Sequence, residues 1–286
     1  MKVNGAKGKL VIIGGGEDKE GDRTILKEFV RLAGGSKARI VVMTVATDEP
    51  QEAGAEYKRV FKKLGAEDVQ VVDVSARKDV HDEKALKMIE QATGIFFTGG
   101  DQIHITSLMG GTEMQELIRR RYQDGAVLGG TSAGAAMMSN SMIIGGDSNC
   151  NPRSGVMEIG PGMDFLPDTM IDTHFSQRGR FGRLLTAVAH YPQDVGFGID
   201  ENTALVLSDH QLEVLGENSV TVIDAGGITY TNLPDLERDQ PLTLHGVKVH
   251  VLSEGQKFDL EKRAPVDETA KTEKSKAAAA QKTKGR

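Results

Sequence analysis

The sequence has a single cysteine, Cys150, so no intrachain disulfide can form and nothing in it suggests an oxidising compartment. It also lacks any apolar run approaching the roughly 20 residues that a membrane span needs. The apolar run near the N-terminus is short and ends in glycines, unlike a signal peptide. No HExxH motif and no cysteine–histidine cluster with metal-binding spacing occurs. We therefore expect a cytoplasmic protein with no membrane association, no metal and no other cofactor.

Charge is unevenly distributed along the 286 residues, whose formal net charge is −6. Residues 271–286 contain five Lys, one Arg, one Glu and no large apolar residue, so they cannot bury anything. We predict a disordered basic tail over residues 267–286 and a single α/β domain over residues 1–266. A basic tail can touch nucleic acid, but we interpret this one as a solvated end and expect no nucleic-acid partner.

Apolar runs typical of buried strands alternate with segments of helical periodicity through the first half of the chain. The expected strands are 9–15, 38–46, 69–74, 94–100 and 126–131. The expected helices are 22–35, 52–65, 82–92, a helical stretch ending near residue 122, and one starting at 133. This alternation predicts a mostly parallel sheet with helices on both faces. From about residue 194 the pattern changes to strands separated by Gly, Asn and Asp turns, which we interpret as an antiparallel, β-rich C-terminal extension of the same domain.

The segment GGTSAGA contains the pattern G-x-S-x-G, with Ser132 at its centre. By itself the pattern is weak, but here it stands between an expected strand and an expected helix, the setting of a nucleophile elbow. The residues two before and two after such a nucleophile approach closely and must be small. The alternatives are a glycine-rich turn that binds phosphate, or a turn without a ligand.

A serine nucleophile needs a base, and the base needs an orienting group. Among the seven histidines, His174 differs because it ends an apolar strand, and strand ends of an open parallel sheet face one crevice. The segment GIDENTAL offers Asp200 and Glu201 as orienting carboxylates. Their alternative role is a turn between two strands.

Five ordered motifs together resemble cyanophycinases of peptidase family S51: IIGGGEDK (12–19), FTGGDQ (97–102), GGTSAGAAMMS (129–139), DTHFSQRGRFGRLL (172–185) and GIDENTAL (198–205). The resemblance extends from about residue 8 to residue 265. It implies a flavodoxin-like core of the class I glutamine-amidotransferase type and a homodimeric serine exopeptidase. The implied substrate is cyanophycin, an aspartate polymer with arginine on each β-carboxyl, cleaved to β-Asp-Arg dipeptides.

The same resemblance implies roles for individual residues. Ser132 is the expected nucleophile, His174 the base and Glu201 its orienting carboxylate. The N–H of Ala133, with that of Gly99 or Gly100, forms the expected oxyanion hole. The expected substrate-binding residues are Gln102, Asp172, Arg178, Arg180 and Arg183. Thr173 stands where some relatives carry glutamine.

Periodicity predicts how the arginines are arranged. We expect a helix that begins near Gln177 and buries a stripe formed by Phe181, Leu184, Leu185 and Val188. Arg178 and Arg180 flank this stripe, and Arg183 points outward unless a partner subunit or a loop covers it. Arginine suits a carboxylate because its planar fork donates two parallel hydrogen bonds.

Two other functions remain open from the sequence. One is an aspartyl dipeptidase-like serine peptidase of the same family, acting on short Asp-containing peptides. The other is a flavodoxin-like ligand-binding protein without enzymatic activity.

Overall fold

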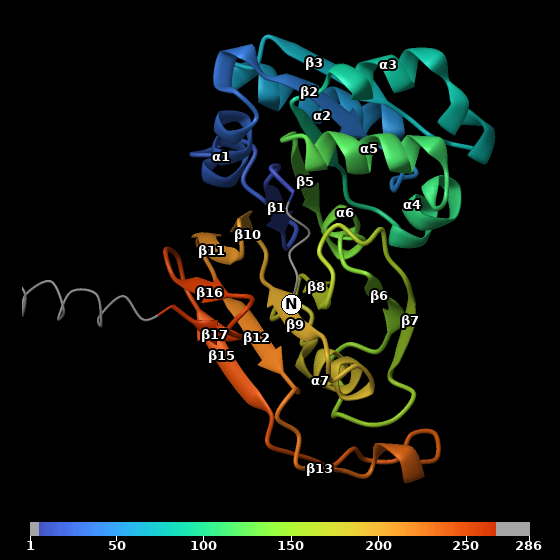
Figure 1. The fold of residues 1–286 in the computed structure, drawn as a ribbon, viewed down its shortest axis with the longest axis vertical. Helices are drawn as coiled ribbons and strands as arrows, with labels where there is room; N and C mark the ends of the chain where they lie inside the picture. The colour runs from blue at the N-terminus through green and yellow to red at the C-terminus, as the bar shows by residue number, and fades with distance from the viewer. Residues whose placement is uncertain (1–5, 267–286) are drawn as a thin grey trace, which may run out of the picture.

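The computed structural model describes residues 6–266, and its centre is a nine-stranded sheet in the order β17-β16-β11-β10-β1-β5-β4-β2-β3 (Figure 1). The parallel part comprises β1 (Leu10–Ile13), β2 (Arg39–Met43), β3 (Asp68–Val72), β4 (Gly94–Phe97) and β5 (Val127–Thr131). Most of these strands are almost wholly buried, as parallel strands covered on both faces must be. The predicted parallel sheet is confirmed.

Helices cover both faces of this sheet, and each face has its own apolar cluster. On one face, α1 (Thr24–Leu32) and α2 (Pro50–Lys63) pack over Val11 and Ile13. On the other, α3 (Glu83–Gln91), α4 (Gln102–Met109) and α5 (Glu113–Gln123) pack over Leu10 and Ile12. The alternation along β1 follows from the two-residue period of a strand. Short 3₁₀ turns lie at η1 (Gly35–Lys37), η2 (Arg77–His81) and η3 (Leu233–Asp235).

The C-terminal third extends the central sheet with antiparallel strands. These are β10 (Thr203–Ser208), which pairs with β1, followed by β11 (Gln211–Gly216), β16 (Lys257–Asp259) and β17 (Ala264–Pro265). Part of the predicted β-rich extension therefore belongs to the main sheet.

A second, four-stranded sheet has the order β15-β12-β9-β8 and lies below the parallel part of the central sheet in Figure 1. Its strands are β8 (Thr169–Thr173), β9 (Val195–Ile199), β12 (Val220–Asp224) and β15 (Lys248–Leu252). Two expectations are corrected here. The strand that ends before His174 belongs to this sheet and not to the open parallel sheet, and β9 pairs with β8 in parallel although we expected only antiparallel strands from there on.

Two small elements flank the second sheet. The hairpin β6 (Ser141–Gly146)–β7 (Met157–Pro161) follows the short helix α6 (Ala133–Ala136), and α7 (Phe181–His190) follows β8. The loop of this hairpin is tied to the segment between β13 (Tyr230–Thr231) and β14 (Leu244–His245), where the Ser154 N–H donates to the Gln240 carbonyl at 3.0 Å. No helix within residues 6–266 is both long and apolar enough to cross a membrane. The predicted basic tail lies outside the described residues.

Candidate active site

Ser132 occupies a sharp turn between β5 and α6. Its backbone angles, φ 53° and ψ −113°, lie in a region that residues with a Cβ rarely adopt. A Cβ at Gly130 would lie 2.1 Å from the Gly134 carbonyl oxygen, and a Cβ at Gly134 would lie 2.5 Å from the Phe97 carbonyl oxygen. Both positions therefore require glycine, as expected for an elbow that exposes Ser132.

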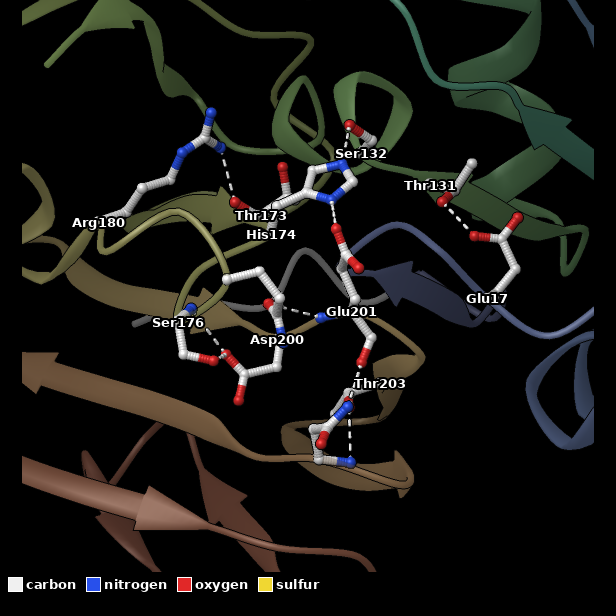
Figure 2. A network of polar contacts seen from close by, with 12 residues as sticks. Glu17, Thr131, Ser132, Thr173, His174, Ser176, Arg180, Asp200, Glu201 and Thr203 are labelled. Atoms are coloured by element: carbon white, nitrogen blue, oxygen red, sulfur yellow. Dashed lines mark hydrogen bonds and ion pairs between the residues drawn. The ribbon is translucent and has the colours of Figure 1, made fainter. Parts of the chain in front are cut away.

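His174 lies directly after β8, with its ring against Ser132. Its Nε2 is 2.9 Å from Ser132 Oγ (Figure 2). The His174 N–H donates to the Gly14 carbonyl at 2.7 Å, which joins the end of the second sheet to the end of β1. A Cβ at Gly15 would lie 2.3 Å from the imidazole, so this glycine makes room for the ring.

Glu201 lies in the turn between β9 and β10 and faces the opposite edge of the imidazole. Its Oε1 is 2.6 Å from His174 Nδ1 (Figure 2). The Glu201 carbonyl accepts hydrogen bonds from Asn218 Nδ2 at 2.8 Å and Thr203 Oγ1 at 3.1 Å, which hold the turn in place. The two interpretations of this segment are compatible, because it is a turn and it also supplies a carboxylate to His174.

Asp200, the neighbouring carboxylate, points elsewhere. It is 5% exposed and accepts hydrogen bonds from the N–H and Oγ of both Ser176 and Ser219, at 2.5–3.3 Å. These bonds tie the segment after His174 to the loop before β12. The structure thus brings Ser132, His174 and Glu201 together and gives Asp200 a supporting position.

The three expected oxyanion-hole residues lie around Ser132. Ala133 begins α6, and a Cβ at Gly99 would lie 3.4 Å from Ser132 Cβ. Across residues 6–266, no hydrogen-bond acceptor is seen for the N–H of Ala133, Gly99 or Gly100. Gly100 has a packing requirement of its own, because a Cβ there would lie 1.9 Å from the Ala46 carbonyl oxygen.

A cavity of about 310 Å³ opens beside Ser132 and contains all five expected substrate-binding residues in its wall. They are Gln102, Asp172, Arg178, Arg180 and Arg183. We call it the arginine cavity. Gln102 donates from Nε2 to the Ile143 carbonyl at 2.7 Å, so its amide nitrogen is engaged with β6.

The arginines differ in their surroundings. Arg183 donates two hydrogen bonds to Asp172, from Nε at 2.7 Å and from a terminal nitrogen at 2.5 Å, and Arg180 adds a third at 3.2 Å. Arg178 is exposed, and no hydrogen bond or ion pair of its side chain is seen among the described residues. Burial, followed by the charges of Arg183 and Arg178, lowers the pKa of Arg180 to about 10 against the opposing effect of Asp172. An anion bound here would relieve this crowding of positive charge.

Comparison with known proteins identifies the family of the chain. The model of peptidase family S51 matches residues 10–215. A cyanophycinase of Trichormus variabilis is 40% identical over 259 residues, covering 90% of this chain and 87% of the relative. A cyanophycinase of Geminocystis herdmanii is 37% identical over 262 residues, covering 91% of this chain and 96% of the relative.

The chain belongs to peptidase family S51. A crystal structure of a peptidase from an acI-B1 actinobacterium supports the fold. It superimposes with a TM-score of 0.63 at 20% identity, covering 88% of this chain and 96% of the other.

Four expectations about the arginine segment of this S51 peptidase were wrong. The helix begins at Phe181 and not near Gln177, because residues 174–180 form turns in which Gly179 has a φ of 60°. Arg178 and Arg180 therefore precede the helix and do not flank its stripe. Phe181 is 43% exposed at the first helical position, whereas Leu184 and Val188 are buried. Arg183, expected to point outward, is 6% exposed because it pairs with Asp172.

Sequence reasoning also missed residues of the S51 site. The segment IIGGGEDK was given no site residue in the sequence analysis, yet Gly14 and Gly15 support His174, and the Gly15 carbonyl accepts the Asn202 N–H at 2.9 Å. Three glycines directly after a strand were the available signal. Glu17, from the same motif, is buried and accepts a hydrogen bond from Thr131 Oγ1 at 2.6 Å. Within the part of the chain that the structure describes, no group of three or more His, Cys, Asp or Glu side chains forms a metal site.

Proposed function

We propose that this S51 peptidase is a serine exopeptidase that hydrolyses cyanophycin to β-Asp-Arg dipeptides. The observation that carries the proposal is the continuous contact from Ser132 Oγ to His174 Nε2, at 2.9 Å, and from His174 Nδ1 to Glu201 Oε1, at 2.6 Å. The identity of the proposed substrate is inferred from the relatives, which bear the name cyanophycinase.

In this proposal, His174 takes the proton from Ser132 Oγ as the oxygen attacks the backbone carbonyl of an aspartyl residue. Glu201 accepts from Nδ1, which keeps Nε2 free to act as base and stabilises the imidazolium. The N–H of Ala133 and that of Gly99 or Gly100 donate to the oxyanion; Gly99 packs beside Ser132. Each such donor lowers the barrier by about 3–4 kcal/mol.

The tetrahedral intermediate collapses by breaking the C–N bond. The departing α-amine takes the proton from His174, which leaves an ester between Ser132 and the shortened polymer. A water that gives its proton to His174 then hydrolyses the ester and restores the Ser132 hydroxyl. Arg178 and Arg180 bind substrate carboxylate, since an enzyme that removes terminal units must recognise a chain end. Asp172 holds Arg180 and Arg183 in place.

A substrate panel tests the proposal. Purified cyanophycin, oligomers of β-Asp-Arg and α-Asp dipeptides are incubated with the enzyme, and the products are identified by mass spectrometry. Release of β-Asp-Arg from the polymer supports the proposal. Cleavage of α-Asp dipeptides alone would make the chain an aspartyl dipeptidase. If no substrate is cleaved and a serine-directed organophosphonate does not label Ser132, the chain is a ligand-binding protein.

We further propose that the enzyme is a homodimer, as the resemblance implies, and that it is cytoplasmic, as a chain with a single cysteine suggests. The exposed edge strand β15 supports self-association, because its apolar side chains Val249 and Val251 are 47% and 67% exposed. Light scattering coupled to size-exclusion chromatography tests it: twice the chain mass of 30.8 kDa is expected, and a monomer overturns it.

A further inference from the structure

A second cavity, of about 560 Å³, opens beside Ser132 and His174, and no residue of the proposed carboxylate site belongs to it. Besides these two residues, its wall contains Glu17, Lys19, Glu20, Glu56, Tyr57 and Thr131. We call it the acidic cavity, because three carboxylates and one ammonium group line it. Ser132 is shared with the arginine cavity, so the nucleophile stands between two pockets of opposite charge. Figure 2 shows Arg180 and Glu17 on opposite sides of Ser132 and His174.

Glu17 is the most unusual residue of the acidic cavity. It is 6% exposed, and its two carboxylate oxygens accept hydrogen bonds from the Tyr57 hydroxyl and from Thr131 Oγ1. Burial and the charge of Glu17 raise the pKa of Tyr57 well above its ordinary value, so this hydroxyl remains a donor. Among residues 6–266, no cationic side chain lies within 4 Å of the Glu17 carboxylate. A buried carboxylate held only by neutral hydroxyls is rare, because its desolvation is not offset by a countercharge.

Lys19 does not supply that countercharge. Its Nζ lies 2.6 Å from Glu56 and 4.4 Å from the centre of the Tyr57 ring. Lys19 thus neutralises Glu56 in part, while Glu17 and the exposed Glu20 are left as negative charges facing the cavity. The acidic cavity therefore favours a cation from outside the protein, and the Tyr57 ring already carries one ammonium group on its face.

We infer that the acidic cavity is a substrate subsite that takes the guanidinium of an arginyl side chain. The inference rests on the proposed function. The terminal unit of cyanophycin carries a chain-end carboxylate, and the arginines of the polymer carry guanidinium groups. The arginine cavity on one side of Ser132 suits the carboxylate, and the acidic cavity on the other side suits a guanidinium. A guanidinium fits a carboxylate through two parallel hydrogen bonds, which gives the subsite geometric selectivity as well as charge selectivity.

The test compares two synthetic substrates: an oligomer of three β-Asp-Arg units, and the same oligomer with citrulline in place of arginine. Citrulline keeps the shape of the side chain but replaces the guanidinium by a neutral urea. We expect the wild type to show a kcat/KM for the arginine oligomer about tenfold or more above that for the citrulline oligomer, as a charged hydrogen bond warrants. Glu17→Gln and Glu56→Gln should each reduce this ratio, mainly by losing activity on the arginine oligomer.

The ratio of kcat/KM on the arginine oligomer to kcat/KM on the citrulline oligomer separates recognition of the guanidinium from a structural role. A distorted site would lose activity on both oligomers alike. Glu52→Gln is the matched control, since Glu52 is exposed one turn earlier on α2 and lies outside the acidic cavity. If Glu17→Gln does not fold, Glu56→Gln carries the test. Equal activity of the wild type on both oligomers, or an unchanged ratio in every folded variant, overturns the inference while the proposed function stands. If the wild type cleaves neither oligomer, the proposed function fails and the inference with it.

Discussion

His174 Nε2 lies 2.9 Å from Ser132 Oγ, and both residues hold backbone φ angles of the left-handed region, 48° and 53°. Such angles carry strain of about 1–3 kcal/mol each in residues other than glycine. Both residues are anchored to the end of β1, because Ser132 N–H donates to the Ile13 carbonyl at 3.0 Å and His174 N–H to the Gly14 carbonyl at 2.7 Å. The end of this one strand therefore sets the distance between the proposed nucleophile and its base.

Substitution of Ser132 separates activity from backbone strain. We expect Ser132→Ala to remain folded and to lose essentially all hydrolysis. Ser132→Gly should be equally inactive but more stable than Ser132→Ala by about 1 kcal/mol, because glycine adopts a positive φ without the clash of a Cβ. Urea denaturation of both variants, together with the hydrolysis assay, measures the two effects. Residual turnover within about tenfold of the wild type would remove Ser132 from the nucleophile role.

Substitution of Glu201 should reduce activity, whereas substitution of Asp200 should reduce stability. Glu201→Gln keeps the shape of the side chain but loses the charge that stabilises the imidazolium, so we expect kcat to fall by about 100-fold or more with KM and melting temperature little changed. Asp200→Asn removes an acceptor for Ser176 and Ser219, so it should lower the unfolding free energy by about 1–3 kcal/mol. Steady-state kinetics and thermal melts of both variants provide the comparison. A larger loss of kcat in Asp200→Asn would mean that Asp200 is the orienting carboxylate.

The arginines divide into substrate-binding and structural members. Arg178→Lys and Arg180→Lys should lower kcat/KM on cyanophycin about tenfold or more, because lysine keeps the charge but lacks the fork. Arg183→Lys keeps the charge but breaks the two-bond contact with buried Asp172, so we expect a loss of about 1–3 kcal/mol in stability. Arg59→Lys, an exposed position on α2, is the control for both assays. Unchanged kinetics in the first two variants would place the carboxylate site elsewhere.

The buried carboxyl of Asp194 should make the free energy of unfolding depend on pH. It is 1% exposed, and neither carboxylate oxygen has a hydrogen-bond partner among the described residues. Burial, and then the nearby charge of Asp168, raises its pKa from 3.8 to about 6, against the opposing effect of Arg263. Because the folded-state pKa is the higher one, folding favours the protonated form, and this contribution is lost as the pH rises through about 6.

We therefore expect Asp194→Asn to be more stable than the wild type by about 1–3 kcal/mol at pH 7.5, and nearly equal to it at about pH 4. Urea denaturation at the two pH values measures this difference. A variant that is destabilised at pH 7.5 would show that the ionised carboxylate is stabilised in the folded state.

The alternating strands and helices could be predicted because each parallel strand is a continuous apolar run. The nucleophile elbow could be predicted because the residues two before and two after Ser132 must be small, and both, Gly130 and Gly134, are glycines. The partner of β8 could not be predicted. The β6–β7 hairpin intervenes between β5 and β8, and nothing in the local pattern states which sheet a strand joins.

The segment after His174 shows a second limit of sequence reasoning. Its helical periodicity was correct for Leu184 and Val188, but the start of α7 is set by contacts distant in sequence. Gly179 turns against the β6–β7 loop, where its carbonyl accepts the Asn149 N–H at 3.0 Å. Arg183 is buried because Asp172 lies on the neighbouring strand end, a pairing that amphipathic spacing cannot reveal. Glu17 was missed for the same reason, since its partner Thr131 is 114 residues away.

The most direct test of the central claim is to incubate purified cyanophycin with the wild type and with Ser132→Ala and to follow the products over time by mass spectrometry. We predict that β-Asp-Arg dipeptides are the first small products of the wild type, and that Ser132→Ala releases none. Release of dipeptides by both proteins, or by neither, would contradict a Ser132-dependent cyanophycin exopeptidase.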